Sequence, residues 1–169
     1  NWNSCSRRSR AWNRKTEKKQ KSYYSGKQGY HTLKSQVLAN PKTRQILCTA
    51  HSRGKIHDFQ LWKNSRIGID KETECLADKG YQGIQKIHVK SRTPYKKKQS
   101  AKLNKEQKKF NRTLAKERII IEHIHRSLKI FRILSSRYRN RRRRFSLRFN
   151  LIAGIYNYEL FGTCERAIY

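Results

Sequence analysis

The pattern of apolar and polar positions predicts alternating strands and helices over most of the chain. Residues 30–38 alternate between apolar and polar side chains, and the more apolar residues 44–50 follow after an Asn-Pro turn. Such a pair of runs predicts a β-hairpin. Next come a short helix over residues 59–65, with Asp58 in the N-cap position, and a three-residue apolar run over 75–77 typical of a buried strand.

The C-terminal half predicts helices. Residues 84–89 give another short strand or helical turn, and a lysine-rich loop follows it. A long helix is then expected from about residue 100 or 104 to about 134, and a last helix over 146–160. Apolar residues at helical spacing predict the core side of each helix: Ile121, Ile124, Leu128 and Phe131 on the first, and Phe145, Phe149, Ile152, Tyr156 and Leu160 on the second. A hairpin followed by alternating elements indicates an α/β layered domain.

Residues 1–22 differ from the rest because they show no apolar periodicity and are strongly basic. This composition is typical of a disordered segment. The expected organisation is therefore a basic segment over 1–22, disordered or read from another frame, one folded domain over 23–162, and a short tail over 163–169.

The charge balance restricts the partners that the chain can have. Its 169 residues include 42 Lys and Arg against 11 Asp and Glu, a formal net charge of +31. A polyanion that neutralises this charge is expected, with nucleic acid ahead of an anionic membrane surface. No apolar run is long enough to span a bilayer, so a cytoplasmic or nucleoid-associated location is expected. The four cysteines lie far apart in the sequence, which favours reduced thiols over disulfides.

Two carboxylates stand out as candidates for chemistry. Asp78 ends the predicted buried strand and precedes a glycine turn, where open α/β sheets place their ligands; capping of the next helix is the equal alternative. On the long helix, Glu122 lies among cations, on one side with Arg118, His125, Arg126 and Lys129. A surface ion-pair ladder from Arg118 through Glu122 to Arg126 is the simpler reading of that side. Residues 137–144 form a basic run of the kind that contacts phosphates.

Taken in order, these motifs resemble the DDE transposases of bacterial insertion sequences. Asp78-Lys79-Gly80-Tyr81 matches the D-x-G-[YF] motif, and Arg118, Glu122 and Lys129 match Y-x-x-R-x-x-x-E-x-x-x-x-x-x-K at the right spacings. The leading Tyr of the second motif is absent, since Ala115 occupies its place. Further matching blocks are residues 23–27, 31–34, 57–58 and 139–160.

The resemblance implies a ribonuclease-H-like mixed sheet flanked by helices, and metal-dependent cleavage and strand transfer of DNA. Two divalent cations, Mg²⁺ or Mn²⁺, would be held by three carboxylates, of which Asp78 and Glu122 are two. Arg118 and Lys129 would hold DNA phosphates, and Tyr81 would pack against a terminal nucleotide. The remaining expected DNA contacts are Arg126, Arg141, Arg142, Arg143 and Arg144.

The first acid of this triad is missing from the sequence. The resemblance places it on a strand near Arg7 to Arg10, but no Asp or Glu occurs before Glu17. We therefore expect the first strand to be missing or degraded, through a frame shift or a truncated gene. The resulting expectation is a transposase remnant, a homodimer being allowed, that binds DNA but does not cut it efficiently. The alternative is a non-enzymatic basic nucleic-acid-binding protein.

Overall fold

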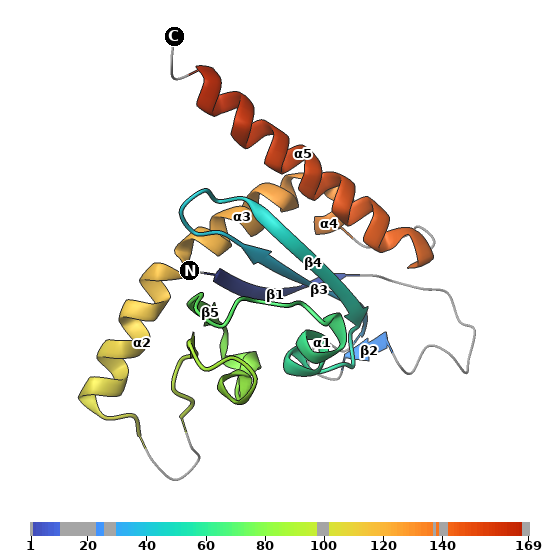
Figure 1. Ribbon diagram of the computed structural model, residues 1–169. Coiled ribbons are helices and arrows are strands. Elements are labelled where there is room, and N and C mark those ends of the chain that lie inside the picture. Colours follow the sequence, from blue (N-terminus) through green and yellow to red (C-terminus); the bar gives the residue numbers. More distant parts are fainter. Residues whose placement is uncertain are drawn as a thin grey trace.

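Six strands form the centre of the structure, a computed structural model (Figure 1). It describes residues 2–10, 23–25, 30–97, 102–136, 138 and 142–166, with the backbone alone described for 2–10, 25, 30–31 and 163–166. The strands are β1 (Trp2–Arg10), β2 (Tyr24–Ser25), β3 (Tyr30–Ala39), β4 (Ile46–Arg53), β5 (Cys75–Ala77) and β6 (Ser91–Arg92). The predicted hairpin is confirmed as β3 and β4, which pair antiparallel, and the predicted buried strand as β5.

The sheet is mixed, as expected for an α/β domain. Its order runs β2–β3–β1–β5–β6, and β4 also pairs with β3. Strand β1 is antiparallel to β3 but parallel to β5, and β5 is parallel to β6. The coarse expectation of mixed α and β elements is therefore confirmed.

The expectation that the chain lacks a first strand is wrong. Strand β1 occupies residues 2–10, inside the segment predicted to be disordered, and lies between β3 and β5. A strand between two others forms ladder hydrogen bonds along both edges, which its side-chain pattern does not reveal. Residues 11–22, the rest of that predicted segment, lie outside the described residues.

Two apolar clusters cover the two sides of the sheet. On one side, Val37 and Leu33 of β3 pack with side chains from the C-terminal helices. On the other, Leu38 of β3 and Ala77 of β5 pack with Trp62 of the short helix. Figure 1 shows the same arrangement, with α3, α4 and α5 on one side of the sheet and α1 on the other. The alternation of Val37 and Leu38 between the clusters follows from the two-residue period of a strand.

The helices begin and end in slightly different places from those predicted. The helices are α1 (Asp58–Ser65), α2 (Lys105–Glu117), α3 (Ile119–Ile130), α4 (Arg132–Ser135) and α5 (Phe145–Arg166). His57, and not Asp58, is the N-cap of α1, since its ring Nδ1 accepts from the Phe59 N–H at 3.4 Å. The region between β5 and β6 forms the 3₁₀ turns η2 (Lys79–Tyr81) and η3 (Ile84–Lys86), and η4 (Arg142–Arg144) precedes α5.

The single long helix predicted up to residue 134 is instead three helices. Arg118 separates α2 from α3, and Phe131, with extended backbone, separates α3 from α4. Hydropathy periodicity persists through such breaks and does not reveal them. Most of the predicted core residues on these helices and on α5 are buried. The exceptions are Phe131, Tyr156 and Leu160, each of which is half-buried.

Two findings concern the expectations about membrane spans and about the cysteines. Within the described ranges, no helix is both long enough and apolar enough to cross a bilayer. Cys48 and Cys75 are free thiols, as expected, and burial raises the pKa of Cys75 to about 12, which keeps that thiol protonated and unreactive.

Candidate functional site

Asp78 lies at the carboxyl end of β5, where its side chain caps the following turn and pairs with Arg118. Its Oδ1 accepts a hydrogen bond from the Lys79 N–H at 2.7 Å, so the carboxylate caps η2. The same Oδ1 lies 3.1 Å from Nη1 of Arg118. The Asp78 side chain remains 36% exposed, so capping of η2 does not prevent its carboxylate from meeting a ligand.

Arg118 brings the helix motif to the strand motif. Its backbone forms the junction of α2 and α3, where its φ of −82° and ψ of −7° allow the two helices to change direction. The side chain is only 14% exposed and extends to Asp78. Its Nε is buried and has no hydrogen-bond partner among the described residues. A buried guanidinium with an unused donor is suited to an anionic ligand.

Glu122 lies one helical turn after Arg118 and is exposed. Arg126 and Lys129, the next cations on that side of α3, are exposed as well. The predicted apolar stripe is confirmed, because Ile121, Ile124 and Leu128 are each at most 2% exposed. This stripe fixes the helix against the sheet, so that the polar side of α3 carrying Glu122 faces outward. His125, predicted for the polar side, is instead buried at 4% exposure.

Asp58 packs directly beside the Asp78 turn, a contact that the sequence did not predict. A Cβ added to Gly80 would lie 3.1 Å from both Cβ and Cγ of Asp58, and closer still to Oδ2. Lys34 of β3 holds this carboxylate, with Nζ 2.9 Å from its Oδ1, and also donates to the Ile56 carbonyl. The glycine of the D-x-G-Y motif is therefore needed to accommodate Asp58, which links two motifs that lie 20 residues apart.

Tyr81, which we expected to pack against a terminal nucleotide, lies in the core of the domain. Its side chain is fully buried, at 0% exposure. The hydroxyl donates to Oε1 of Gln36 at 3.4 Å, and the ring meets that of Trp62 edge-on, 6.4 Å between centroids. The aromatic residue of the motif is a core anchor, because it places the Asp78 turn against the α1 side of the sheet.

The basic run before α5 is only partly described. Arg143 and Arg144 are exposed in η4, and the guanidinium of Arg142 lies over the ring of Tyr23, 4.3 Å from its centroid. Arg53 lies 5.4 Å from the same ring. Arg141, another predicted DNA contact, lies outside the described residues.

The register of the sheet identifies the position that lies level with Asp78. Ser4 of β1 pairs with Ala77, so the next step along this parallel ladder joins position 5 to Asp78. Position 5 also pairs with Val37, which belongs to the apolar cluster under α3. The residue at that position is Cys5. The residue of β1 that lies level with Asp78 is therefore not an acid.

The described acids do not form a complete metal centre. Asp78 and Glu122 offer oxygen ligands of the kind that Mg²⁺ and Mn²⁺ take. However, the described side chains include no group of three or more His, Cys, Asp or Glu residues able to hold a metal ion. Asp58, the nearest further carboxylate to the Asp78 turn, is paired with Lys34. The described side chains therefore do not supply the three carboxylates that the resemblance implies.

Sequence comparisons agree with the motifs. The family described as DDE superfamily endonuclease matches residues 10–157. A probable transposase for insertion sequence element IS702 from Microchaete diplosiphon is 58% identical over 144 residues, which cover 85% of this chain and 52% of the relative. The chain thus spans about half the length of that relative, and no solved structure matches. Because the matched family covers most of the chain, including Asp78, Arg118 and Glu122, the protein belongs to the DDE superfamily of endonucleases and resembles its insertion-sequence transposases.

Proposed function

We propose that this chain is the catalytic domain of a DNA transposase that binds DNA through the Asp78–Arg118 site but has an incomplete set of metal ligands. The observation that carries the proposal is the 3.1 Å contact of Asp78 with Arg118. It joins the end of β5 to the start of α3 and thereby brings two motifs, 40 residues apart, to one place. Glu122 follows Arg118 on the same side of α3.

The topology supports the ribonuclease-H-like fold as part of this proposal. The central strand β1 pairs antiparallel with β3 of the hairpin on one side and parallel with β5 on the other, and β5 pairs parallel with β6. In open sheets of this kind, ligands bind at the carboxyl ends of the parallel strands, where Asp78 is found.

The cation enters the proposal only as a ligand of Asp78 and Glu122. A divalent ion held there would withdraw charge from a phosphodiester and so assist its cleavage. The protein residues position the substrate: Arg118 fixes the Asp78 carboxylate and places a positive charge beside it for a phosphate. With Cys5 level with Asp78, a third acidic ligand is missing, so we expect cleavage to be inefficient.

Exposed cations on α3 and η4 supply the DNA-binding surface in this proposal. Arg126 and Lys129 extend the polar side of α3 beyond Glu122, and Arg143 and Arg144 lie in η4. Each phosphate that these residues neutralise releases counterions, so affinity should fall steeply with salt. With a charge of +31, the chain is expected to associate with bacterial DNA in the nucleoid.

A second candidate function follows from the lack of a third acidic ligand beside Asp78 and Glu122 among the described side chains. If Asp78 and Glu122 serve only as partners for cations, the chain is a basic DNA-binding protein without nuclease activity. Salt-dependent DNA binding supports either function, whereas an effect of metal ions supports only the first.

Thermal unfolding with added Mn²⁺ separates these functions. We expect millimolar Mn²⁺ to raise the melting temperature of the wild-type protein and to have a smaller effect on Glu122→Gln. Glu106→Gln is the matched control, because Glu106 is an exposed helical glutamate on α2. An equal shift in all three proteins would mean that Mn²⁺ binds elsewhere. No shift in any of them would favour the DNA-binding protein.

A further inference from the structure

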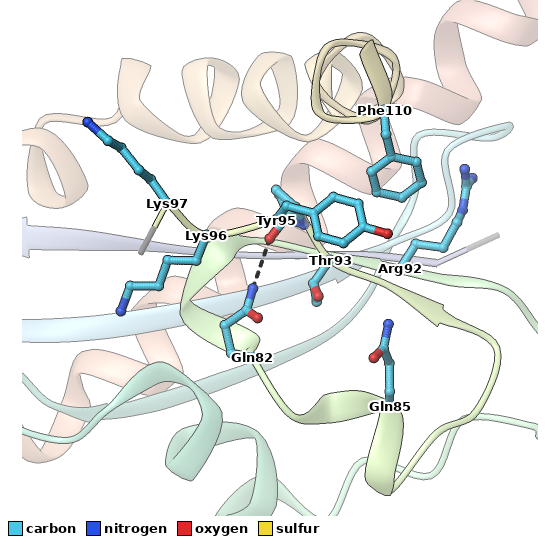
Figure 2. Close-up of a pocket in the computed structure, with 9 residues that line it drawn as sticks. Gln82, Gln85, Arg92, Thr93, Tyr95, Lys96, Lys97 and Phe110 are labelled. Carbon is cyan, nitrogen blue, oxygen red and sulfur yellow. Dashed lines mark hydrogen bonds between the residues drawn. The ribbon is translucent and has the colours of Figure 1, made fainter. Parts of the chain in front are cut away.

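A pocket next to the Asp78 turn has no role in the proposed function so far. It has a volume of about 870 Å³, which lies in the range of ligand sites. Figure 2 shows its lining, which comes from three segments: the turns after Asp78, the end of β6 with the stretch after it, and helix α2. The lining residues are Gln82, Gln85, Arg92, Thr93, Pro94, Tyr95, Lys96, Lys97 and Phe110.

Two connections tie this pocket to the Asp78–Arg118 site. Gln82 follows Asp78 by four residues, and its Nε2 donates to the Pro94 carbonyl at 2.9 Å. On the other side, Nη2 of Arg92 lies 2.6 Å from Oε2 of Glu117, the residue before Arg118. The pocket and the Asp78–Arg118 site are therefore linked through the segments that carry Asp78 and Arg118.

Tyr95 is held by contacts with two residues of α2 although it is exposed. The Tyr95 N–H donates to Oδ1 of Asn111 at 2.8 Å, and its carbonyl accepts from Nδ2 of the same side chain at 3.1 Å. The ring meets the ring of Phe110 edge-on, at 5.3 Å between centroids, and yet the residue is 48% exposed. Such a fixed ring with open area is a preorganised surface for stacking.

The chemistry of the lining selects a flat, anionic ligand. It combines the Tyr95 ring, two side-chain amides and three cations, and it includes no carboxylate. Lys96 and Lys97 are exposed at one end, whereas Arg92 is already paired with Glu117 and Glu74. Amides can hydrogen-bond the edge of a base, the ring can stack on its face, and lysines can bind the adjoining phosphates.

We propose that this pocket takes an unpaired nucleotide of the DNA, with its base stacked on Tyr95 and its phosphates near Lys96 and Lys97. This inference rests on the proposed function, since it assumes DNA at the Asp78–Arg118 site. The nucleotide must be unpaired because both faces of a base inside a duplex are covered by its neighbours.

The test compares two DNA duplexes that differ in one nucleotide: one carries a bulged 2-aminopurine and the other carries the same base paired with thymine. We expect the wild-type protein to bind the bulged duplex about tenfold more tightly, since stacking contributes about 1–3 kcal/mol per base. Binding should also quench the fluorescence of the bulged base. Tyr95→Ala should lose the preference, and Tyr95→Phe should keep it. Tyr158→Ala, which removes a tyrosine that is 79% exposed on α5, is the matched control.

Equal affinity of the wild-type protein for the two duplexes would overturn the proposal, as would an unchanged preference in folded Tyr95→Ala. If Tyr95→Ala fails to fold, 5-iodouracil in the bulge tests the wild-type protein directly. Photo-crosslinks at Tyr95 or Phe110 support the pocket, and crosslinks found only elsewhere contradict it. The paired duplex distinguishes the two proposals: failure to bind either DNA refutes DNA binding itself, whereas binding without preference refutes only the pocket.

Discussion

Two ion pairs lie near Gly80, and they differ in how much water they meet. In the first, Lys34 and Asp58 are 7% and 23% exposed, and Asp58 packs against Gly80. In the second, Arg118 and Asp78 are 14% and 36% exposed, and the buried Nε of Arg118 has no partner within the described part of the chain. The carboxylate of the first pair is largely enclosed, whereas that of the second pair is partly open to solvent.

This difference assigns separate roles to two aspartates of the same neighbourhood. Asp58 holds the Asp78 turn in place through its contact with Gly80, so its effect should be on stability. Asp78 is held by Arg118 at the end of a strand and should act on ligands. The following predictions test this division, beginning with the largest expected effect on stability.

Lys34→Met should lower the free energy of unfolding by about 3 kcal/mol, because it leaves the Asp58 carboxylate without its partner in a largely buried place. Urea denaturation measures the change. The matched control is Lys90→Met, whose ion pair with Glu72 is exposed and should contribute about 1 kcal/mol or less. Equal losses in the two variants would show that Asp58 does not depend on an enclosed pair.

Acid should destabilise the protein through His51. Burial lowers the pKa of His51 from 6.5 to about 4, so the folded state favours the neutral ring. Its contribution is complete above pH 6.5 and is lost as the pH falls towards 4, amounting to roughly 2–3 kcal/mol. Urea denaturation across this range should show the decline in the wild-type protein and a flatter profile in His51→Gln. A persistent decline in the variant would point to the carboxylates instead.

Gly80→Ala should cost about 2 kcal/mol, since the new methyl group would overlap the Asp58 side chain. The control is Gly68→Ala, because no atom lies within 4 Å of a Cβ added there. A double-mutant cycle with Asp58→Ala should show coupling between the two sites. Additive losses of stability would mean that Asp58 is not what excludes a side chain at Gly80.

Arg118→Met should have the smallest effect on stability, less than about 1 kcal/mol, because water can solvate the exposed part of Asp78. Its affinity for duplex DNA should nevertheless fall about tenfold, a loss of about 1.4 kcal/mol. Fluorescence anisotropy at fixed salt measures the affinity. A large loss of stability with unchanged DNA affinity would reverse the roles assigned to the two pairs.

Local patterns predicted the elements that carry the open pair. Asp78 at the end of β5 follows from a short apolar run before a glycine turn, and the buried stripe of α3 follows from helical spacing. Both features are properties of adjacent residues, which is why the sequence contains them.

Features that depend on distant segments were not predictable in this way. The residues of β1 form a strand through their pairing with β3 and β5, and their own hydropathy gives no sign of it. The burial of Tyr81, the contact of Asp58 with Gly80 and the pocket around Tyr95 each join segments from different parts of the chain. The only local sign of the pocket was an aromatic residue between a proline and a lysine run.

Metal-dependent nicking of supercoiled DNA tests the central claim most directly, namely that Asp78 is the ligand-facing acid of a site that lacks one carboxylate at position 5. With Mn²⁺, the wild-type protein should stay near background. Cys5→Asp should nick the DNA, Cys5→Asn should not, and adding Asp78→Asn to Cys5→Asp should abolish the gain. Strong nicking by the wild-type protein that Asp78→Asn removes would contradict the missing-acid account, and so would an inactive Cys5→Asp that folds and binds DNA.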